Sequence, residues 1–475
     1  AGCNLPTVSR TTKTEHLQTK DTCAVRAGVI AFRRKRMKVC VVGLGYIGLP
    51  TATLAAAAGH EVIGIDTAAR VVESINRGNP HIHEPGLSQL VKEVVRKGTL
   101  RAQTNVCDAD VFLVAVPTPI TDDKCADLSY VRQALLSVVP QLQEGSLFII
   151  ESTIPPGCTE DVVIPILQES DLTAGADFYV AHCPERVIPG DIMHELVNND
   201  RVVGGVDPES AERARRFYAT FVKGAIYTTG LREAELTKLA ENAYRDVNIA
   251  FANELATVCE RLGVNPWEVI RMANRHPRVN ILNPGPGVGG HCIAVDPWFL
   301  VEACPREARL IATAREVNDK RPERIANQVA TEVLNKCKVD RPVVACLGLT
   351  YKADVCDLRG SPSLEVAACL ARKGFEIRTC DPYADGKSPF SCLPVEEAVD
   401  GADALVLLVD HKEYTELDVE GLKELMRHRI VIDTKGVWNP SSNRDAVASL
   451  SKDHPDAGQE AAAREMVDGS WSNSA

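Results

Sequence analysis

The sequence is poor in aromatic residues and lacks several features that mark whole classes of protein. Of its 475 residues, 5% are aromatic, 25% charged and 45% apolar, which excludes collagen-like, low-complexity and wholly disordered chains. No apolar run approaches the roughly 18 residues that cross a bilayer, so no membrane partner is expected. The 53 basic residues are outnumbered by 64 acidic ones, and the net charge of −11 argues against nucleic acid. A globular protein of about three domains remains.

The cysteines do not form a recognisable framework. All sixteen lie outside C-x-x-C pairs, and several, such as Cys40, Cys346 and Cys369, lie within apolar runs. We therefore expect buried, reduced thiols in a cytoplasmic protein, with neither disulfides nor a bound metal.

The two ends of the chain differ from its middle. Residues 1–36 show no apolar periodicity and end in a basic cluster, whereas Met37 opens directly into a strand-like run. We interpret 1–36 as a disordered extension before a native start at Met37. Residues 451–475, rich in Ser, Asp, Ala and Glu, are expected to be a disordered tail.

Between these ends, short β-branched runs alternate with helix-length segments, which predicts an α/β fold with parallel sheets. The first set of expected strands is 38–43, 61–66, 111–116, 147–151 and 178–182. The second set is 343–348, 376–381, 404–409 and 430–433, with a helix over 362–373 that Ser361 caps. We expect two doubly wound, Rossmann-like domains at 37–229 and 336–450, joined by a helical domain at 230–335.

The helical domain opens with one long helix over 231–262. Its main apolar side is expected to carry Leu236, Leu239, Ala240, Ala243, Val247, Ala250, Phe251 and Val258. From Ile249 the opposite side is also small and apolar, with Ala252, Ala256 and Cys259. A helix that is apolar all round is typical of a core or a subunit interface.

The sharpest local motif is Gly43-Leu-Gly45-Tyr46-Ile47-Gly48, which follows a strand and precedes an alanine-rich helix. Glycines let the backbone approach a pyrophosphate, and the helix N-terminus favours its charge. Asp66 ends the next strand, where it can accept from a ribose hydroxyl and repel a 2′-phosphate, so NAD is favoured over NADP. Arg70 nearby weakens that preference. The alternative is a tight turn that binds nothing.

Two more loops follow strands of this domain and carry Thr118 and Thr153. Ligands of open α/β sheets meet the carboxyl ends of strands, so both hydroxyls can face the nicotinamide half of the coenzyme. Taken singly, each threonine is as well explained as a turn cap.

A glycine-rich loop carries the candidate nucleophile. It runs Gly-Val-Gly289-Gly-His291-Cys292 and continues to Asp296. Such backbone lets a thiolate approach a substrate, and a positive neighbour would lower its pKa. The alternative is a cysteine of the core. We do not expect a Cys–His dyad, because adjacent side chains point apart.

The long helix offers the positive neighbour. Lys238, Asn242 and Arg245 lie at i, i+4 and i+7 and share one stripe. A lysine in a partly dry cleft can stabilise an alkoxide, and an asparagine can donate to an oxyanion. A solvated polar face is the simpler alternative.

Together these motifs resemble the nucleotide-sugar 6-dehydrogenases, over Met37 to about Val447. The resemblance is carried by G-L-G-Y-I-G-L-P, by the helix segment from Lys238 to Arg245, by G-V-G-G-H-C-I-A-V-D-P, and by Tyr351-Lys352 with Asp357-Leu-Arg359-Gly-Ser. It implies oxidation of a sugar C6 alcohol to a carboxylate with two NAD⁺, through a thioester on Cys292.

The resemblance also implies roles for single residues. Lys238 and a water held by Asp296 would stabilise charge on the reacting oxygen, Asn242 and Thr118 would fix that oxygen or water, and Glu185 would activate the hydrolytic water. Arg359 would reach the coenzyme pyrophosphate. Further nucleotide-sugar contacts are expected from Gly289, Tyr351, Lys352 and Lys435.

The substrate branch follows from the loop Pro184-Glu185-Arg186-Val187-Ile-Pro-Gly, which lacks the second glutamate of the UDP-glucose branch. It resembles the N-acetylhexosamine branch, where Arg186, Val187 and Arg245 contact the sugar, with His276 and Arg278 from the same or a neighbouring subunit. H-C-I-A-V-D-P-W and R-D-V-N-I-A-F-A-N-E favour UDP-N-acetyl-D-mannosamine over its glucosamine epimer, and UDP-glucose stays an alternative. A homodimer or homotetramer is expected.

Two other classes of function stay open on the sequence. One is a single-step hydroxyacid or phosphogluconate-type dehydrogenase, which would release one NADH and not need Cys292. The other is an NAD-binding module without catalysis, which would never reduce its coenzyme.

Overall fold

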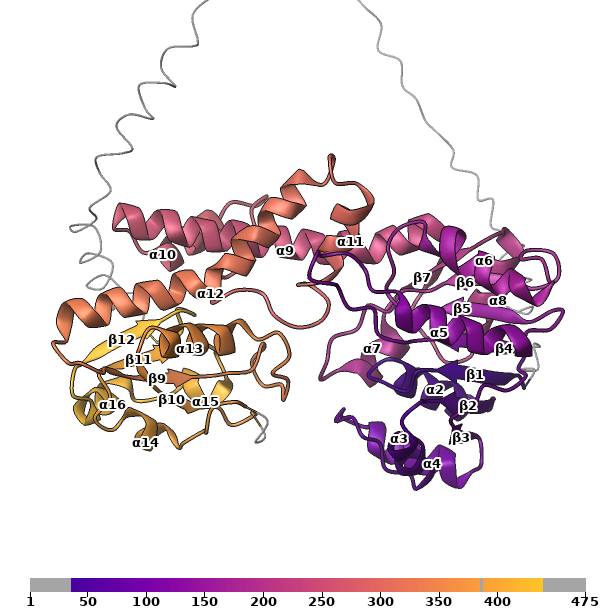
Figure 1. Ribbon diagram of the computed structural model, residues 1–475, viewed down its shortest axis with the longest axis horizontal. Coiled ribbons are helices and arrows are strands. Elements are labelled where there is room, and N and C mark those ends of the chain that lie inside the picture. The colour runs from indigo at the N-terminus through magenta and orange to yellow at the C-terminus, as the bar shows by residue number, and fades with distance from the viewer. Residues whose placement is uncertain (1–35, 385–387, 439–475) are drawn as a thin grey trace, which may run out of the picture.

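The computed structural model describes residues 36–384 and 388–438. Two α/β units lie side by side, and one long helix extends over both of them while another lies along the second unit (Figure 1). The expected extension and tail, 1–36 and 451–475, lie outside the described residues apart from Arg36. No helix among the described residues is long and apolar enough to cross a membrane.

The first unit is built on one eight-stranded sheet in the order β3-β2-β1-β4-β5-β6-β7-β8. Its strands are β1 Lys38–Val42, β2 Glu61–Ile65, β3 Leu100–Gln103, β4 Val111–Val114, β5 Leu147–Ile150, β6 Tyr179–His182, β7 Arg201–Gly205 and β8 Ile226–Gly230. Its α-helices are α2 Gly48–Ala57, α3 Ala69–Asn76, α4 Leu87–Arg96, α5 Ser129–Val138, α6 Ile164–Leu167, α7 Ile192–Asn198 and α8 Pro208–Tyr218. Short turns of other helix types cover Val139–Gln141, Thr159–Val163 and Gln168–Ser170.

The first six strands in this order make the doubly wound arrangement of dinucleotide-binding folds. They pair in parallel, and their buried faces form two apolar clusters, one on each side of the sheet. The last two strands, β7 and β8, run antiparallel to β6. Parallel strands direct their carboxyl ends to one edge, so the loops after β1, β2, β4, β5 and β6 meet there.

The second α/β unit has a four-stranded parallel sheet in the order β10-β9-β11-β12. Its strands are β9 Val343–Leu347, β10 Glu376–Cys380, β11 Ala404–Leu407 and β12 Ile430–Asp433. Its helices are α13 Pro362–Arg372, α14 Val395–Val399, α15 Lys412–Thr415 and α16 Val419–Leu425. Ser361 caps α13 by accepting from the backbone N–H groups of Ser363 and Leu364, as the sequence predicts.

An acidic residue follows the second strand of each sheet, and its hydrogen-bond partners differ between the two sheets. Asp66 Oδ2 accepts one long bond, from Leu44 N at 3.3 Å. Asp381, which follows β10, accepts at Oδ2 from Leu349 N (2.5 Å) and Thr350 N (2.9 Å), and the buried His411 lies 3.2 Å from the same oxygen. Oδ2 of Asp381 is therefore filled from within the domain, while Oδ1 accepts one bond, from Tyr383 N at 2.7 Å.

The helical middle consists of α9 Leu231–Leu262, α10 Pro266–Ala273, α11 Asp296–Ala303 and α12 Arg309–Lys336. The bounds of α9 are those the sequence predicts, and the small residues Ala252, Ala256 and Cys259 are buried as expected. The expected main apolar face is only partly confirmed, because Leu239, Ala243 and Ala250 are buried but the rest of it is not. Leu236, Ala240, Phe251 and Val258 are exposed, whereas Glu235, Lys238, Asp246 and Asn253 are buried.

A polar network explains why a polar stripe of α9 is buried. Asp246 Oδ1 accepts from Arg315 Nη1 at 2.5 Å and from Asn318 Nδ2 at 2.8 Å, both on α12. Asn253 donates to Asn318 Oδ1 at 2.9 Å and accepts from Gly285 N at 2.9 Å, at the start of the glycine-rich loop. Because α12 supplies these partners, the two helices and the loop are held in one register.

Removing the cation from this network should destabilise the fold. In Arg315→Met, the buried carboxylate of Asp246 loses its counter-ion, and we expect a loss of about 3–5 kcal/mol in urea unfolding followed by circular dichroism. The matched control is Arg324→Met on the same helix, whose side chain is 50% exposed and whose ion pair with Glu260 spans 3.6 Å. It should cost less than about 1 kcal/mol. Equal losses in both variants would contradict the assignment.

Candidate active site

The Gly43–Gly48 segment forms the turn between β1 and α2, at the carboxyl edge of the first sheet. A Cβ atom on Gly48 would lie 1.8 Å from the carbonyl oxygen of Gly43, so only glycine allows the helix to begin this close to the strand. Gly45, Tyr46 and Ile47 occupy the turn and are half-buried. A narrow glycine cradle that faces a helix N-terminus fits the pyrophosphate of a dinucleotide.

Asp66 follows β2 directly and is half-buried. Its Oδ1 accepts from Ala68 N at 2.9 Å, and its Oδ2 has only the long bond from Leu44 N. The carboxylate is therefore fixed in place with capacity left for a ribose hydroxyl. Arg70 lies in the exposed first turn of α3.

The loops after β4 and β5 are tied to each other and to α9. Ser152 Oγ donates to Val116 O at 2.8 Å and accepts from Val116 N at 2.9 Å, two residues before Thr118. Lys238 Nζ donates to Thr153 Oγ1 at 2.5 Å, and Lys238 is buried. The structure thus brings Thr153 to Lys238 and places Thr118 on the adjoining loop.

Buried Glu235, one turn before Lys238 on α9, fixes this loop further. Its carboxylate accepts from Gly157 N at 2.6 Å and from Thr159 N at 2.8 Å, and also from the Thr159 hydroxyl. Burial raises the pKa of Glu235, and the bonds to residues 157 and 159 oppose that shift. Glu235 was not predicted from the sequence, because a glutamate on a helix usually faces water.

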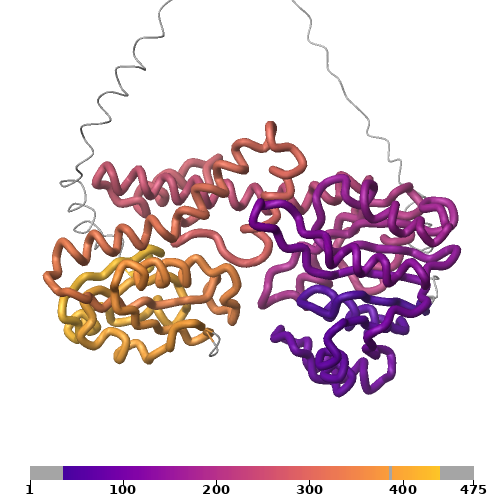
Figure 2. Tube along the Cα trace, in the orientation of Figure 1, coloured from indigo at the N-terminus to yellow at the C-terminus, as the bar shows by residue number. Residues whose placement is uncertain are grey.

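The cysteine loop passes between the two α/β units. Figure 2 shows the segment between α10 and α11 running through the space beneath α12. Gly290, with φ of +82°, packs on the ring of Tyr351, where a Cβ would lie 2.9 Å from Cε2. The carbonyl of Cys292 accepts from Val295 N at 3.0 Å and Asp296 N at 2.8 Å, so Cys292 lies in the turn that opens α11. Cys292 keeps exposed surface, as a nucleophile requires.

Asp296 joins this loop to α9. Its Oδ2 accepts from Asn242 Nδ2 at 2.6 Å. Burial raises the pKa of the Asp296 carboxyl, while Lys238 and Asn242 act to lower it. Surrounding protein raises the pKa of the Cys292 thiol, and the ammonium of Lys238 is the strongest influence in the opposite direction. The structure therefore brings Lys238, Asn242, Cys292 and Asp296 together at one place.

Glu185 lies in the loop after β6 and is buried. Its Oε2 forms an ion pair with Arg201 Nη2 at 3.0 Å, and its Oε1 accepts from Arg186 N at 2.7 Å. His182, the last residue of β6, has its pKa lowered to about 3 by burial and by nearby Lys238. The loop that carries Glu185 thus begins beside Lys238.

The second α/β unit reaches the glycine turn of the first. The guanidinium carbon of Arg359 lies 5.0 Å from the ring centre of Tyr46, and Arg359 also pairs with Asp357, with Nη2 2.6 Å from Oδ2. Lys435 Nζ pairs with Asp410 at 3.1 Å and lies beside Gly285. Gly289 packs against Tyr351, and Lys352 is exposed one residue later. Arg359 therefore lies beside the glycine turn, and its charge also acts to lower the pKa of the Cys292 thiol.

Other expected sugar contacts are less closely assembled within one chain. Arg186 pairs with Glu241 of α9 at 2.5 Å, and Val187 packs against the cluster of Leu54, Ile192 and Leu196. Arg245 is exposed on α9. His276 and Arg278 lie beyond α10, which follows the end of α9. Lys238 lies near the start of α9, and at 1.5 Å per residue it is about 36 Å along the helix from Leu262 at the other end.

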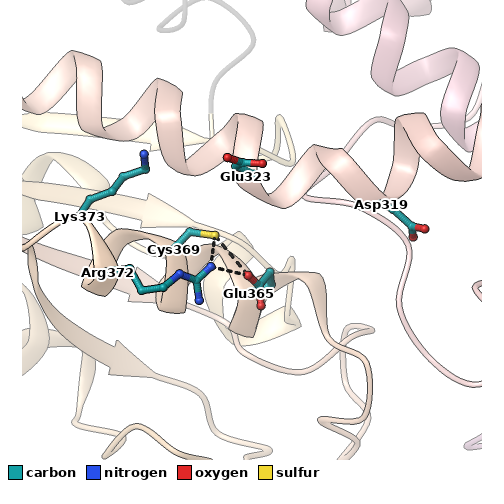
Figure 3. A pocket seen from close by; sticks show the side chains of 6 residues that line it. All are labelled: Asp319, Glu323, Glu365, Cys369, Arg372 and Lys373. Carbon is teal, nitrogen blue, oxygen red and sulfur yellow. Dashed lines mark hydrogen bonds and ion pairs between the residues drawn. The ribbon is translucent and has the colours of Figure 1, made fainter. Parts of the chain in front are cut away.

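Two other clusters lie apart from this site. Figure 3 shows an open groove between α12 and α13, lined by Asp319, Glu323, Glu365, Cys369, Arg372 and Lys373, where Arg372, Glu365 and Cys369 bond to one another. Cys337, Asp403 and His428 have donor atoms within 4.8 Å of one another. Both oxygens of Asp403 are already engaged by Arg427, with His428 and Val343 N as further donors, so the group offers a cation little.

Family comparisons cover nearly all of the described chain. Three models of the UDP-glucose/GDP-mannose dehydrogenase family match: the NAD binding domain at residues 37–222, the central domain at 232–320 and the UDP binding domain at 345–440.

Individual proteins are also similar over most of their length. An NDP-N-acetyl-D-galactosaminuronic acid dehydrogenase of Ralstonia nicotianae is 48% identical, covering 84% of this chain and 96% of that protein. A UDP-N-acetyl-D-mannosamine dehydrogenase of Methanocaldococcus jannaschii is 47% identical, covering 85% and 93%. The solved structure of a UDP-D-ManNAc dehydrogenase from Pyrococcus horikoshii superposes with a TM-score of 0.80 at 42% identity, covering 84% and 96%.

Proposed function

This chain belongs to the UDP-glucose/GDP-mannose dehydrogenase family, and from that premise we propose that it oxidises the C6 alcohol of UDP-N-acetyl-D-mannosamine to the uronate. It is an NAD-dependent nucleotide-sugar dehydrogenase. The observation that carries the proposal is the convergence of Lys238, Asn242, Asp296 and Cys292 beside the carboxyl edge of a dinucleotide-binding sheet.

The coenzyme, when bound, accepts the hydride in each of two oxidations. In the first, Lys238 stabilises the negative charge that develops on the C6 oxygen as its proton leaves. Asn242 and Asp296, which are bonded to each other, hold the water or hydroxyl that takes that proton. The product of this step is an aldehyde.

Cys292 explains why the reaction continues past the aldehyde. Its sulfur adds to the aldehyde carbon and the thiol proton passes to the oxygen, which gives a thiohemiacetal. The oxygen lone pair can expel the C6 hydride from this adduct, whereas hydride loss from the free aldehyde would leave an unstable acylium cation. The second oxidation leaves a thioester on Cys292. Water then attacks the carbonyl carbon, the C–S bond breaks, and the uronate leaves with two NADH formed per sugar.

The sugar itself is the finer part of the proposal. The loop Pro184–Gly190 and the motifs around Arg245 and Cys292 favour an N-acetylhexosamine, and relatives named for N-acetylmannosamine are 45–47% identical. A second candidate is an N-acetylgalactosamine nucleotide, because a relative named for that sugar acid is 48% identical. The two sugars differ in configuration at C2, which bears the acetamido group, and at C4, which bears a hydroxyl.

Counting NADH tests both the reaction and the sugar. Purified protein is given limiting UDP-N-acetylmannosamine, UDP-N-acetylglucosamine, UDP-N-acetylgalactosamine or UDP-glucose, and absorbance at the end point is compared with uronate by mass spectrometry. We expect two NADH per UDP-N-acetylmannosamine and the highest kcat/KM for that sugar. One NADH per sugar would support a single-step dehydrogenase instead, and a preference for the galactosamine nucleotide would reassign the substrate.

Asp66 should determine coenzyme choice. In Asp66→Ser, a charge-assisted bond to the ribose hydroxyl and the repulsion of a 2′-phosphate are both lost. We expect the ratio of kcat/KM for NADP⁺ over NAD⁺ to rise by roughly 10- to 100-fold, as expected for an interaction of about 1.5–3 kcal/mol. Glu73→Gln on α3 is the control and should leave the ratio unchanged. A wild type with equal rates on both coenzymes would contradict this role.

We infer further that the active form is an oligomer in the cytoplasm. α9 exposes Tyr244 (68%), Phe251 (54%) and Leu262 (68%), a larger apolar surface than an isolated helix keeps in water. A second copy on this face would also bring its His276 and Arg278 loop toward a sugar site. Light scattering of wild type and Phe251→Asp tests the interface, and a monomeric wild type would contradict it.

The cytoplasmic location is inferred from the thiols, because free thiols such as Cys292 persist in a reducing compartment.

A further inference from the structure

In the first α/β unit, two buried carboxylates, those of Glu151 and Glu185, lie close to one buried guanidinium, that of Arg201. Arg201 Nη2 lies 3.0 Å from Glu185 Oε2, and Arg201 Nη1 lies 3.9 Å from Glu151 Oε1. All three side chains are at most 6% exposed. Neither Arg201 nor Glu151 has a place in the reaction described above.

The surroundings hold this group rigidly. Tyr218 of α8 donates to Glu151 Oε1 at 2.6 Å, and Thr51 of α2 donates to Glu151 Oε2 at 3.3 Å. The Arg201 guanidinium lies 4.7 Å from the ring centre of Tyr218 and 3.6 Å from Cys183 Sγ. Arg201 also donates from Nη2 to Leu196 O of α7 at 3.5 Å, so α2, α7, α8 and the end of β6 all contact the Arg201–Glu151 pair.

The charges do not balance if both carboxylates are ionised. Burial raises the pKa of Glu151 to about 7, Glu185 adds to that rise, and Arg201 opposes it. Arg201 is nearer to Glu185 than to Glu151. Below this pH the group holds one proton on Glu151 and an Arg201–Glu185 pair, and is neutral; above it the group carries one negative charge.

Glu185 is the link from this group to the reaction. It follows His182, which lies near Lys238, and the next residue, Arg186, pairs with Glu241 of α9. Its Oε2 makes no hydrogen bond of good geometry although it is buried beside Arg201. A buried carboxylate oxygen with spare capacity beside the site is suited to accept a proton from water.

We propose that Arg201 and Glu151 are positioning residues that hold the Glu185 carboxylate for hydrolysis of the Cys292 thioester. This inference rests on the proposed function. In the step, a water oxygen bonds to the thioester carbon while one water proton passes to Glu185. The C–S bond then breaks, its electron pair leaves on Sγ, and no oxidant or reductant takes part.

Rapid mixing with UDP-N-acetylmannosamine and NAD⁺ separates hydrolysis from the oxidations. In Arg201→Met we expect a burst of two NADH per subunit at near wild-type rate, followed by turnover about 100-fold slower, as for loss of a general base. Acid-quenched samples analysed by mass spectrometry should show an acyl adduct on Cys292. Arg201→Lys keeps the charge without the forked geometry and should slow turnover about tenfold.

The pH profile of thioester decay tests Glu151. In wild type we expect an inflection near pH 7, where Glu151 gains its charge. Glu151→Gln keeps the shape and the Arg201–Glu185 pair but cannot ionise, so the inflection should be missing. The matched control is Glu332→Gln, a buried glutamate paired with Lys336 in α12, which should keep the inflection and show no burst.

The outcomes separate this inference from the function it rests on. If wild type releases one NADH per sugar, the proposed function fails. If wild type releases two NADH per sugar, but Arg201→Met shows no burst and Glu151→Gln keeps the inflection near pH 7, the positioning role alone fails. Should Arg201→Met not fold, Glu151→Gln decides, because it keeps the ion pair.

Discussion

Cys292→Ala should release no uronate from any nucleotide sugar, with steady-state kcat lowered by roughly 10⁴-fold or more, as when a covalent nucleophile is lost. Without the sulfur, the first oxidation ends at an aldehyde that has no path to a thioester. Any NADH formed should stop at one per sugar bound. The measurement is end-point NADH together with mass spectrometry of the sugar product.

Cys304→Ala is the matched control, because Cys304 is also exposed and ends α11, whose first turn holds Asp296. It should retain wild-type stoichiometry and near wild-type kcat. Uronate released by Cys292→Ala at more than a trace would falsify the covalent mechanism, because the second oxidation would then proceed without the sulfur.

The second large effect is expected from Lys238→Met. The variant removes the positive charge from the place where charge develops on the sugar oxygen, and we expect kcat to fall by about 10³-fold. Lys238 also lowers the pKa of the Cys292 thiol, so its loss should raise that pKa further. Alkylation of Cys292 by iodoacetamide should then need a higher pH than in wild type.

The alkylation profile distinguishes the electrostatic effect of Lys238 on the thiol from misfolding of the variant. A misfolded variant would expose Cys292 and react faster, whereas loss of the ammonium should move the reaction to higher pH. Lys320→Met serves as control, since Lys320 is an exposed lysine of α12 that pairs with Glu316. Its profile and kcat should match wild type. If the profile of Lys238→Met is unshifted, Lys238 does not influence the pKa of the Cys292 thiol, and the role of Lys238 is structural.

Regular elements and chemistry-bearing motifs were predictable from sequence, because each has a local signal. The ends of α9, the Ser361 cap and the strands β1, β2, β4, β5 and β6 follow from apolar patterning within one or two residues. Strands β3, β7 and β8 were missed. β7 begins with the buried Arg201, and β8 mixes polar and apolar residues, so neither shows the run of apolar side chains that marks a central strand.

Which side of a helix is buried depends on its partner, and that information is not local. Half of the expected apolar face of α9 is exposed in the single chain, whereas Asp246 and Asn253 are buried because α12 presents Arg315 and Asn318 to them. The same limit hid Glu151, Arg201 and Glu235. A charged residue on its own is most often solvated, and only the folded chain shows that its counter-charge comes from a distant segment.

The filled oxygen of Asp381 has a consequence for the cysteine loop. The backbone amides of Leu349 and Thr350, which donate to it, lead directly to Tyr351, and Gly289 and Gly290 pack against that side chain. An acid at the end of one strand of the second sheet therefore helps to anchor the surface on which the nucleophile's loop rests.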